Sequence, residues 1–354
     1  MSRPIVVYAY NRPDYLDQVL QALKPQVKDA EVFLFQDGPR ILTDDKPKVQ
    51  GSVDVFSKHF PESKVFASEC NLGVAFNQKR AREFIFNRAD AAIFIEDDIV
   101  LNDYYLEQLN LLMDKFEDDK DISMVSCFGE IHRHTDVFKY CDYLTRYDDW
   151  DKQQERNNNK FMQMEHIWGY GFFKRAYDVV APFMEGYYAM LPDDYRGRPH
   201  QKILEYCAQY DMDPTKVVTS QDSVMSGFLA LNNFIKISTF TMNAQYIGEW
   251  GEHSNADHYA QNWKNYKPYD KMVKDKFPED YKLKDVRNIP KTEQLITPFK
   301  EKDALEQEYT LKDFEKRLQD AVFGTETKAK LKEFLTYDEN SPENKIVLKF
   351  NMRS

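Results

Sequence analysis

Three consecutive carboxylates, Glu96-Asp97-Asp98, directly follow the apolar segment of residues 91–95. A short apolar run of this kind predicts a strand that is buried on both faces, with the acids at its mouth. Neighbouring carboxylates repel one another and lose hydration, so such a cluster tends to persist where a cation compensates it. Oxygen ligands favour Mg²⁺ or Mn²⁺, whose open positions phosphate oxygens can fill. We therefore expect a divalent metal site here.

The tripeptide alone carries little information, because Asp and Glu make up 59 of the 354 residues. The same three residues recur as Glu117-Asp118-Asp119, followed by Lys120-Asp121. This second copy lies in a polar segment after a predicted helix, which indicates a solvated turn. The first triplet differs from the second because a strand that is expected to be buried directly precedes it.

Short apolar runs alternate with helical patterns through about residue 116. The runs cover residues 5–10, 31–35, 64–67 and 91–95, and the helical patterns cover 15–23, 49–60, 74–87 and 104–116. This alternation predicts a mostly parallel sheet with right-handed crossovers and helices on both faces. Ligands of such sheets bind beyond the carboxyl ends of the strands. The polar residues expected at that edge are Arg12, Asp37, Asn71 and the triplet at 96–98.

The second half of the chain has a weaker pattern. We expect a strand over residues 122–128, a polar irregular loop over 129–165, an aromatic and glycine-rich segment over 166–173, a helix over 220–231, a strand over 234–240 and a loop over 243–258. Beyond about residue 260 Lys, Asp and Glu dominate, with short helical patterns at 311–322 and 328–335. We predict division into residues 1–128, 129–258 and a charged helical extension at 259–354.

Composition excludes several classes of protein. The net charge of −11 argues against general nucleic-acid binding, which needs basic patches, while the phosphates of a single nucleotide can be met locally. The four cysteines form no C-x-x-C pair, which disfavours a structural zinc site or a disulfide framework. No signal peptide and no apolar run of about 18 residues is evident. We expect a cytoplasmic protein, and peripheral attachment to the inner face of the membrane stays open.

The order of the short motifs resembles a known enzyme family. Asn11-Arg12, Gln36-Asp37, Asn71-Leu72-Gly73 and Glu96-Asp97-Asp98 follow successive strands, in the order found in glycosyltransferases of the GT-A fold. The pattern resembles the family-2 type enzymes and, more closely, the N-acetylglucosaminyltransferase I group. It covers residues 4–130 well, 160–258 loosely and the last hundred residues not at all. The resemblance implies a Rossmann-like α/β domain with a mostly parallel mixed sheet.

The resemblance also implies an activity: metal-dependent transfer of a sugar from a nucleotide diphosphate sugar, such as a UDP-sugar, to a hydroxyl group. Arg12 would contact the nucleotide or its phosphates, and Asp37 would accept a hydrogen bond from the base. The remaining donor-side roles would fall to Glu96 and Asp97 at the sugar and ribose, Asp98 at the Mn²⁺ or Mg²⁺, Asn71 at the same edge, and Lys79 or Arg80 beside the pyrophosphate.

An inverting transfer needs a base that deprotonates the acceptor hydroxyl. Asp222, at the start of the helix predicted over residues 220–231, is the candidate, and helix capping is its structural alternative. Asp149 and Glu130 are further acidic candidates, with Asp149 also placed on the acceptor side. Trp168 and Tyr170 would stack on an acceptor sugar, unless they pack in the core. His253 would complete the metal shell, with His258 as its substitute.

Other functions stay open at this level. A sugar nucleotidyltransferase usually has a glycine-rich phosphate loop, whereas the first turn here is Asn11-Arg12-Pro13-Asp14. A non-catalytic glycan- or partner-binding protein on the same fold is the other alternative. Neither the sugar, hexosyl or N-acetylhexosaminyl, nor the acceptor, a glycan or a lipid-linked or protein-linked group, follows from the sequence. The extension could pack as a helical layer, form a homodimer, contact partner enzymes or dock on a membrane surface.

Overall fold

The computed structural model describes residues 2–40, 43–129, 154–155, 158, 161–164, 166–214, 217–251, 254–264, 268–271, 307–310 and 345–348. The chain divides into two compact units, Met1–Thr297 and Pro298–Ser354. Most of the described residues belong to the first unit, which contains the triplet at 96–98.

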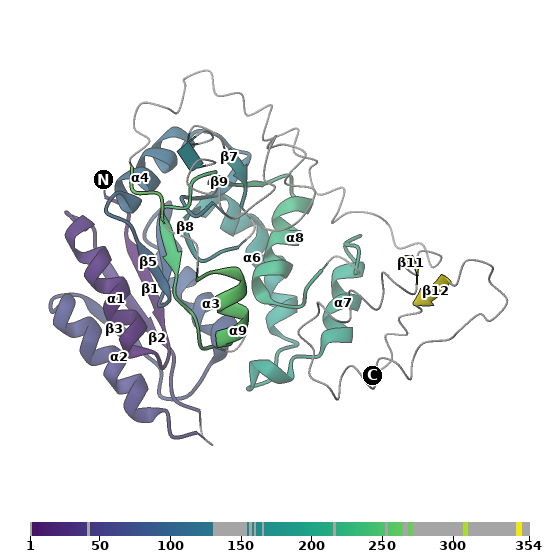
Figure 1. The fold of residues 1–354 in the computed structure, drawn as a ribbon, viewed down its shortest axis with the longest axis horizontal. Coiled ribbons are helices and arrows are strands. Elements are labelled where there is room, and N and C mark those ends of the chain that lie inside the picture. Colours follow the sequence, from purple (N-terminus) through teal and green to yellow (C-terminus); the bar gives the residue numbers. More distant parts are fainter. Residues whose placement is uncertain are drawn as a thin grey trace. The chain divides into compact units, whose positions relative to one another are not determined.

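An eight-stranded mixed sheet forms the centre of the first unit, in the order β3-β2-β1-β4-β8-β6-β9-β7 (Figure 1). β1 to β4 are parallel, β8 is antiparallel to both β4 and β6, and β9 runs parallel to β6 and antiparallel to β7. The mostly parallel mixed α/β sheet predicted from the sequence is confirmed. The strands are β1 (Ile5–Ala9), β2 (Val32–Gln36), β3 (Lys64–Ala67), β4 (Ala91–Glu96), β6 (Ile122–Ser126), β7 (Phe161–Gln163), β8 (Gly169–Phe173) and β9 (Ile235–Thr239).

The register of the parallel strands aligns their carboxyl ends. Ala9 of β1 pairs with Gln36 of β2, and Tyr8 pairs with Glu96 of β4. β1 and β2 are buried along their whole length, as expected for apolar strands covered on both faces. The residues that follow these three strands therefore begin at one edge of the sheet.

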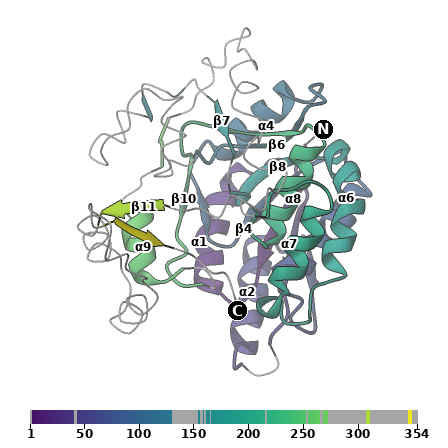
Figure 2. The same ribbon diagram turned by 90° about the vertical axis from the view of Figure 1, so that its right-hand side faces the viewer.

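Helices cover both faces of the sheet (Figures 1 and 2). One core cluster joins Ile5 and Val7 to α1 (Pro13–Leu23), α2 (Lys46–His59) and α4 (Tyr105–Lys115). The other joins Val6 and Tyr8 to α3 (Gly73–Phe86), α6 (Lys174–Tyr188), α7 (His200–Ala208) and α8 (Gln221–Leu231). Successive residues of a strand point to opposite faces, so a single apolar strand supplies both cores. Two short 3₁₀ helices, η1 (Lys24–Gln26) and η4 (Tyr195–Gly197), join these elements.

A small second sheet lies next to the triplet. β5 (Ile99–Leu101) leaves the triplet and pairs antiparallel with β10 (Ala244–Tyr246). The N–H of Ile247 then donates to the carbonyl oxygen of Asp98 at 2.9 Å. The loop expected over residues 243–258 is therefore wrong in part, because it contains β10 and the beginning of α9 (Ala256–Asn262). β7 likewise falls inside the segment expected to be irregular.

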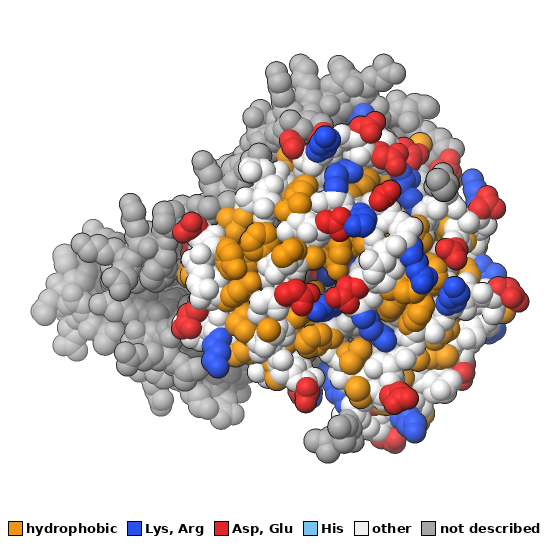
Figure 3. All heavy atoms as spheres, turned by 180° about the vertical axis from the view of Figure 1, so that it is seen from behind, with side chains coloured by type: hydrophobic (Ala, Val, Ile, Leu, Met, Phe, Trp, Pro, Cys, Tyr) orange, Lys and Arg blue, Asp and Glu red, His pale blue; other side chains and the backbone are white. Residues whose placement is uncertain are grey.

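In the second unit, β11 (Gln307–Thr310) pairs antiparallel with β12 (Lys345–Leu348). The helices expected at 311–322 and 328–335 lie outside the described residues. No helix in the described part of the chain is both long and apolar enough to cross a membrane. On the face seen in Figure 3, acidic and basic side chains are interspersed, and the coloured residues show no continuous basic area there.

The second acidic triplet lies in the turn between α4 and β6, whose backbone carbonyl groups bind Arg175. Arg175 donates hydrogen bonds of 2.8–3.0 Å to the carbonyl oxygens of Phe116, Glu117, Asp119 and Ile122. Its guanidinium also lies 3.9 Å from the ring centroid of Phe173. The carboxylate of Glu117 is 66% exposed, in agreement with the solvated turn predicted from the sequence. Arg175 thus holds the turn between α4 and β6 through its backbone.

Replacing Arg175 with Met is expected to lower the free energy of unfolding by about 2 kcal/mol, because part-buried carbonyl groups lose a charged donor. Urea denaturation of the wild type and the variant measures the difference. Unchanged stability would show that water replaces the guanidinium at no cost.

Candidate functional site

Asp97 and Asp98 form a two-residue turn between β4 and β5, at the centre of the sheet. Their exposed fractions are only 4% and 5%. Glu96, the last residue of β4, is half-buried. Two almost fully buried carboxylates require compensation by a cation or by several hydrogen-bond donors.

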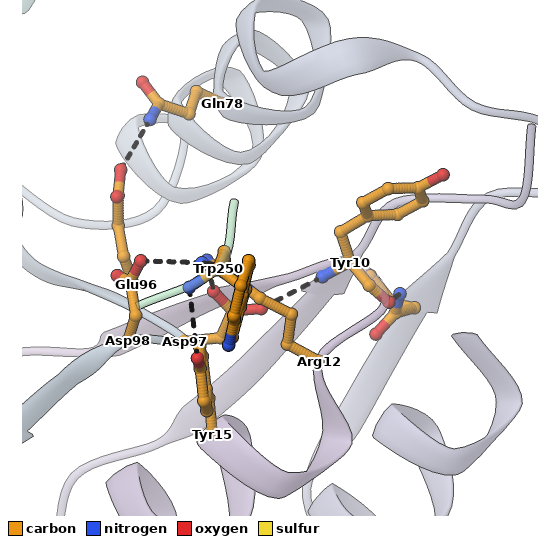
Figure 4. A network of polar contacts seen from close by, with 9 residues as sticks. Tyr10, Arg12, Tyr15, Gln78, Glu96, Asp97, Asp98 and Trp250 are labelled. Atoms are coloured by element: carbon orange, nitrogen blue, oxygen red, sulfur yellow. Dashed lines mark hydrogen bonds and ion pairs between the residues drawn. The ribbon is translucent and has the colours of Figure 1, made fainter. Parts of the chain in front are cut away.

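Arg12 supplies that compensation (Figure 4). Its Nη1 lies 2.8 Å from Oδ2 of Asp98, and its Nη2 forms an ion pair and hydrogen bond with Oδ1 of Asp97. The N–H of Tyr10 donates to Oδ2 of Asp97 at 3.4 Å. Although burial alone would lower the pKa of Arg12, Asp97 and Asp98 raise it above its usual value. The guanidinium therefore stays charged.

The segment after β10 meets Arg12 from the other side. The carbonyl oxygen of Trp250 lies 3.5 Å from Nη1 of Arg12, and the N–H of Trp250 donates to the Tyr15 hydroxyl at 3.3 Å. The Trp250 side chain is 61% exposed and stands beside the acids in Figure 4. An exposed tryptophan at this position can offer its ring to a ligand.

Asp37 has a structural role that the sequence does not reveal. Its carboxylate accepts hydrogen bonds from the N–H groups of Gly38, Leu72 and Gly73 and from the Asn71 amide, at 2.7–3.0 Å. Gly73 has a φ of +73°, which glycine adopts without strain. Asp37 and Asn71 therefore lie together as predicted, but they tie the end of β2 to the start of α3. The contact of Asp37 with a base stays a prediction.

Burial raises the pKa of Asp37 above its usual value, although the backbone N–H groups act in the opposite direction.

Lys79 pairs with acidic side chains of α3 and α6 in this structure. Its ammonium group pairs with Glu185 at 2.7 Å and with Glu83 at 3.6 Å, and lies 5.0 Å from the ring centroid of Tyr188. The pair with Glu185 links α3 to α6, and the pyrophosphate contact of Lys79 stays a prediction. Arg80, its alternative, donates to the carbonyl oxygens at the ends of β2 and β3, Gln36 and Phe66.

Asp222 lies in the first turn of α8, where Ser220 is the N-cap. The Ser220 hydroxyl accepts a hydrogen bond from the N–H of Ser223 at 3.4 Å, so the capping function belongs to Ser220 and not to Asp222. Burial raises the pKa of Glu96 well above its usual value, and the charges of Asp98 and Asp222 raise it further. Asp222 therefore lies within electrostatic range of the triplet, although it is 124 residues away along the chain.

The two predicted aromatic contacts differ in location. Trp168 is partly exposed and stacks on Tyr246, with ring centroids 4.7 Å apart. Its carbonyl oxygen accepts a hydrogen bond from the N–H of Glu96, which fixes this pair next to the triplet. Tyr170, in contrast, is fully buried and stacks on Phe94. Stacking of Tyr170 on an acceptor sugar is therefore corrected to core packing.

Several predicted site residues cannot be placed. Asp149, Glu130 and His253 lie outside the described residues, as does the side chain of His258. Within the described part of the chain, no group of three or more His, Cys, Asp or Glu side chains converges as a ready-made metal cage. A metal bound here would need additional ligands from a substrate or from the remaining residues.

Two further residues, Gln78 and Arg82, lie beside the triplet, and the sequence motifs do not indicate them. Both are 1% exposed, and Nε2 of Gln78 donates to Oε1 of Glu96 at 3.2 Å. They share one face of α3 with Ala75 and Ile85, at the spacing of core residues. Polar side chains at core positions of a helix are the signal that could have identified them.

No protein-family model matches the sequence, and a comparison with curated proteins also gives no match. Similar solved structures include a mannosyltransferase from Pyrobaculum calidifontis in complex with GDP-Man and Mn²⁺ (14% identity, TM-score 0.36, 67% of this chain). They also include a glucosyl-3-phosphoglycerate synthase from Mycobacterium tuberculosis in complex with Mn²⁺ and UDP (13%, 0.28, 50%). A third is a galactosyltransferase in complex with donor and acceptor sugar analogues (11%, 0.31, 74%).

This chain spans 55% and 59% of the length of the first two structures and 92% of the third. All three are sugar transferases or synthases. At TM-scores below 0.5, these similarities establish no function for this chain.

Replacing Arg12 with Met is expected to destabilise the ligand-free protein by about 3–5 kcal/mol, because it leaves two buried carboxylates without their cation. Urea denaturation measures this cost. Arg196→Met is the matched control, since Arg196 pairs at 2.7 Å with Asp194 and both side chains are more than half exposed. Such a pair is worth about 1 kcal/mol or less. Equal losses in the two variants would contradict the compensating role of Arg12.

Replacing Glu96 with Gln is expected to stabilise the ligand-free protein increasingly as the pH rises. Because burial raises the pKa of Glu96, the folded protein binds its proton more tightly than the unfolded chain does. Wild-type stability therefore decreases above the unfolded pKa, and the variant does not share this loss. Urea denaturation between about pH 5 and about pH 8 measures the difference in free energy of unfolding between Glu96→Gln and the wild type. If the stability advantage of the variant became smaller as the pH rises, the burial of this acid would be contradicted.

Proposed function

We propose that this protein is a metal-dependent glycosyltransferase that uses a nucleotide diphosphate sugar, with UDP-sugars as the expected donors. One observation carries the proposal. Glu96, Asp97 and Asp98 lie at the carboxyl edge of a mostly parallel sheet, with Arg12 on one side and Asp222 within electrostatic range. The order of the strand-end motifs, which resembles that of GT-A glycosyltransferases, supports the same conclusion.

The donor side of the site is assigned to Arg12 and the triplet. The guanidinium of Arg12 has the charge and planar geometry to bind a phosphate group. Its side chain is 26% exposed, against 5% and 7% for the side chains of Asp97 and Asp98. Glu96 and Asp97 offer acceptors for the hydroxyl groups of the sugar and ribose. Trp250 and Tyr15 border the same cluster and offer ring surface.

Asp98 fits a divalent cation as a ligand. Its Oδ1 is buried and has no hydrogen-bond partner among the described residues, while Oδ2 pairs with Arg12. A carboxylate oxygen of this kind suits Mn²⁺ or Mg²⁺, with diphosphate oxygens completing the shell. When bound, such a cation supplies Lewis-acid stabilisation of the departing diphosphate.

Asp222 is assigned as the base of an inverting transfer. It lies in the first turn of α8, on a different segment from the donor-binding residues, and is within electrostatic range of Glu96. A carboxylate in this position can take the proton of an acceptor hydroxyl as that oxygen attacks the sugar. The partly exposed pair of Trp168 and Tyr246 offers stacking surface for an acceptor glycan.

The first test measures binding and separates a transferase from a protein that binds glycans alone. UDP or GDP with Mn²⁺ is expected to raise the melting temperature, because a ligand at 100 times its Kd adds about 2.7 kcal/mol. EDTA is expected to abolish most of the shift. No stabilisation by any nucleoside diphosphate would sink the proposed function.

The second test measures catalysis with a panel of nucleotide sugars, by hydrolysis or transfer. Asp222→Asn is expected to lower kcat by about 10²–10⁴-fold with nucleotide binding retained, because it removes a base. Asp98→Asn is expected to weaken Mn²⁺-dependent nucleotide binding. Asp119→Asn, the same position in the second triplet, is the matched control and should keep full activity. Full activity in both site variants would refute these assignments.

A further inference from the structure

Arg82 is an arginine in the interior of the protein. It lies on α3, is 1% exposed, and faces the core between the sheet and α6. A buried guanidinium is costly unless oxygen atoms around it compensate the charge. Its surroundings therefore indicate what it does.

Two oxygen atoms hold one nitrogen of Arg82. Nη2 donates to Oε1 of Gln78 at 2.6 Å and to the Tyr170 hydroxyl at 2.9 Å. Burial alone would lower the pKa of Arg82, but the oxygens of Tyr170, Tyr8 and Tyr188 and the carboxylate of Asp222 raise it above its usual value. The charge is therefore retained, and it lies within range of the proposed base.

Gln78 connects this buried charge to the triplet. Its Oε1 accepts from Arg82, and its Nε2 donates to Oε1 of Glu96 at 3.2 Å. In Figure 4, Gln78 reaches Glu96 from α3, on the opposite side of the acids from Arg12. Arg12 therefore contacts the acids directly on one side. On the other side, Arg82 is connected to them through Gln78.

The chemistry of the two partners fixes the orientation of the Gln78 amide. Arginine is a donor only, so the amide oxygen must face Arg82. The amide nitrogen then faces Glu96, to which it can donate. Without Arg82 the amide could rotate and place its oxygen against the Glu96 carboxyl group, where an unprotonated acid would repel it. Arg82 thus determines which end of Gln78 meets the triplet.

We propose that Arg82 is a positioning residue of this site, which acts through Gln78 to hold one carboxyl oxygen of Glu96 and so orient the other toward the donor sugar. The link Arg82–Gln78–Glu96 stands on its own geometry. Its effect on catalysis rests on the function proposed above. The test therefore needs one readout that is independent of activity and one that is not.

The first readout is hydrogen exchange of the Gln78 side-chain amide, followed by NMR and assigned with Gln78→Met. Slow exchange is expected in the wild type, because the amide is buried and donates to Glu96. Arg82→Met should increase the exchange rate at least about tenfold, since the amide loses its fixed orientation. Arg175→Met removes a structural arginine elsewhere and should leave this signal unchanged. Equally fast exchange in the wild type and in Arg82→Met would overturn the link.

The second readout is steady-state kinetics with the donor found in the panel. Arg82→Met and Gln78→Met should each lower kcat/KM for the donor by about 10–100-fold, because a small misplacement of a binding group has effects of this size. The kcat/KM of the double variant should be no lower than that of the more impaired single variant, because the two substitutions interrupt the same link. The KM for the acceptor should stay the same.

Arg82→Lys keeps a charged donor and should recover part of the donor kcat/KM. If Arg82→Met does not fold, Arg82→Lys and Gln78→Met are the variants that test the link. Arg175→Met should lower stability without changing the donor kcat/KM. A purely structural Arg82 would behave as Arg175 does, and that result would overturn the positioning role.

The outcomes separate the two proposals. A wild-type protein that transfers no sugar from any donor refutes the proposed function, while the Gln78 exchange data still decide whether the link exists. Transfer by the wild type, with additive losses in the double variant, refutes the positioning role alone.

Discussion

Compensation of buried negative charge is the constraint on which this site depends. Asp97 and Asp98 are almost completely buried at the centre of the sheet, and Glu96 is half-buried beside them. Arg12 pairs with both Asp97 and Asp98, so its single positive charge offsets one of their two negative charges. The surrounding backbone supports this arrangement, since Arg12 immediately precedes α1 and Tyr10 donates its N–H to Asp97. A cluster assembled in this way is pre-organised for a cationic or phosphate-bearing ligand, because its electrostatic cost is met during folding.

The sheet register brings the compensating groups together. Tyr8 pairs with Glu96, so the turn after β1 necessarily lies beside the turn after β4. The small sheet of β5 and β10 adds the segment around Trp250 by fixing Ile247 against the Asp98 carbonyl. Asp37 and Asn71, in contrast, use their polar atoms to join β2 to α3. Some of the polar residues at this sheet edge therefore also hold the edge together.

The two acidic triplets show why context matters more than composition. Both have the same three residues, but only the first follows a buried central strand. The second is held by Arg175 through carbonyl oxygens, and its carboxylates play no part in those four hydrogen bonds. An identical tripeptide therefore forms an ionic cluster in one place and an ordinary turn in the other.

Sequence pattern alone predicts the α/β class, the alternation of the first four strands and helices, and the edge at which Arg12, Asp37, Asn71 and the triplet gather. These features depend on local periodicity and on the rule that parallel strands end at the same side. The partners of individual side chains follow instead from the folded structure. It placed Tyr170 in the core, paired Lys79 with Glu185, and linked Arg82 through Gln78 to Glu96. Such pairings join residues far apart in the chain, and their geometry follows from packing that no local pattern records.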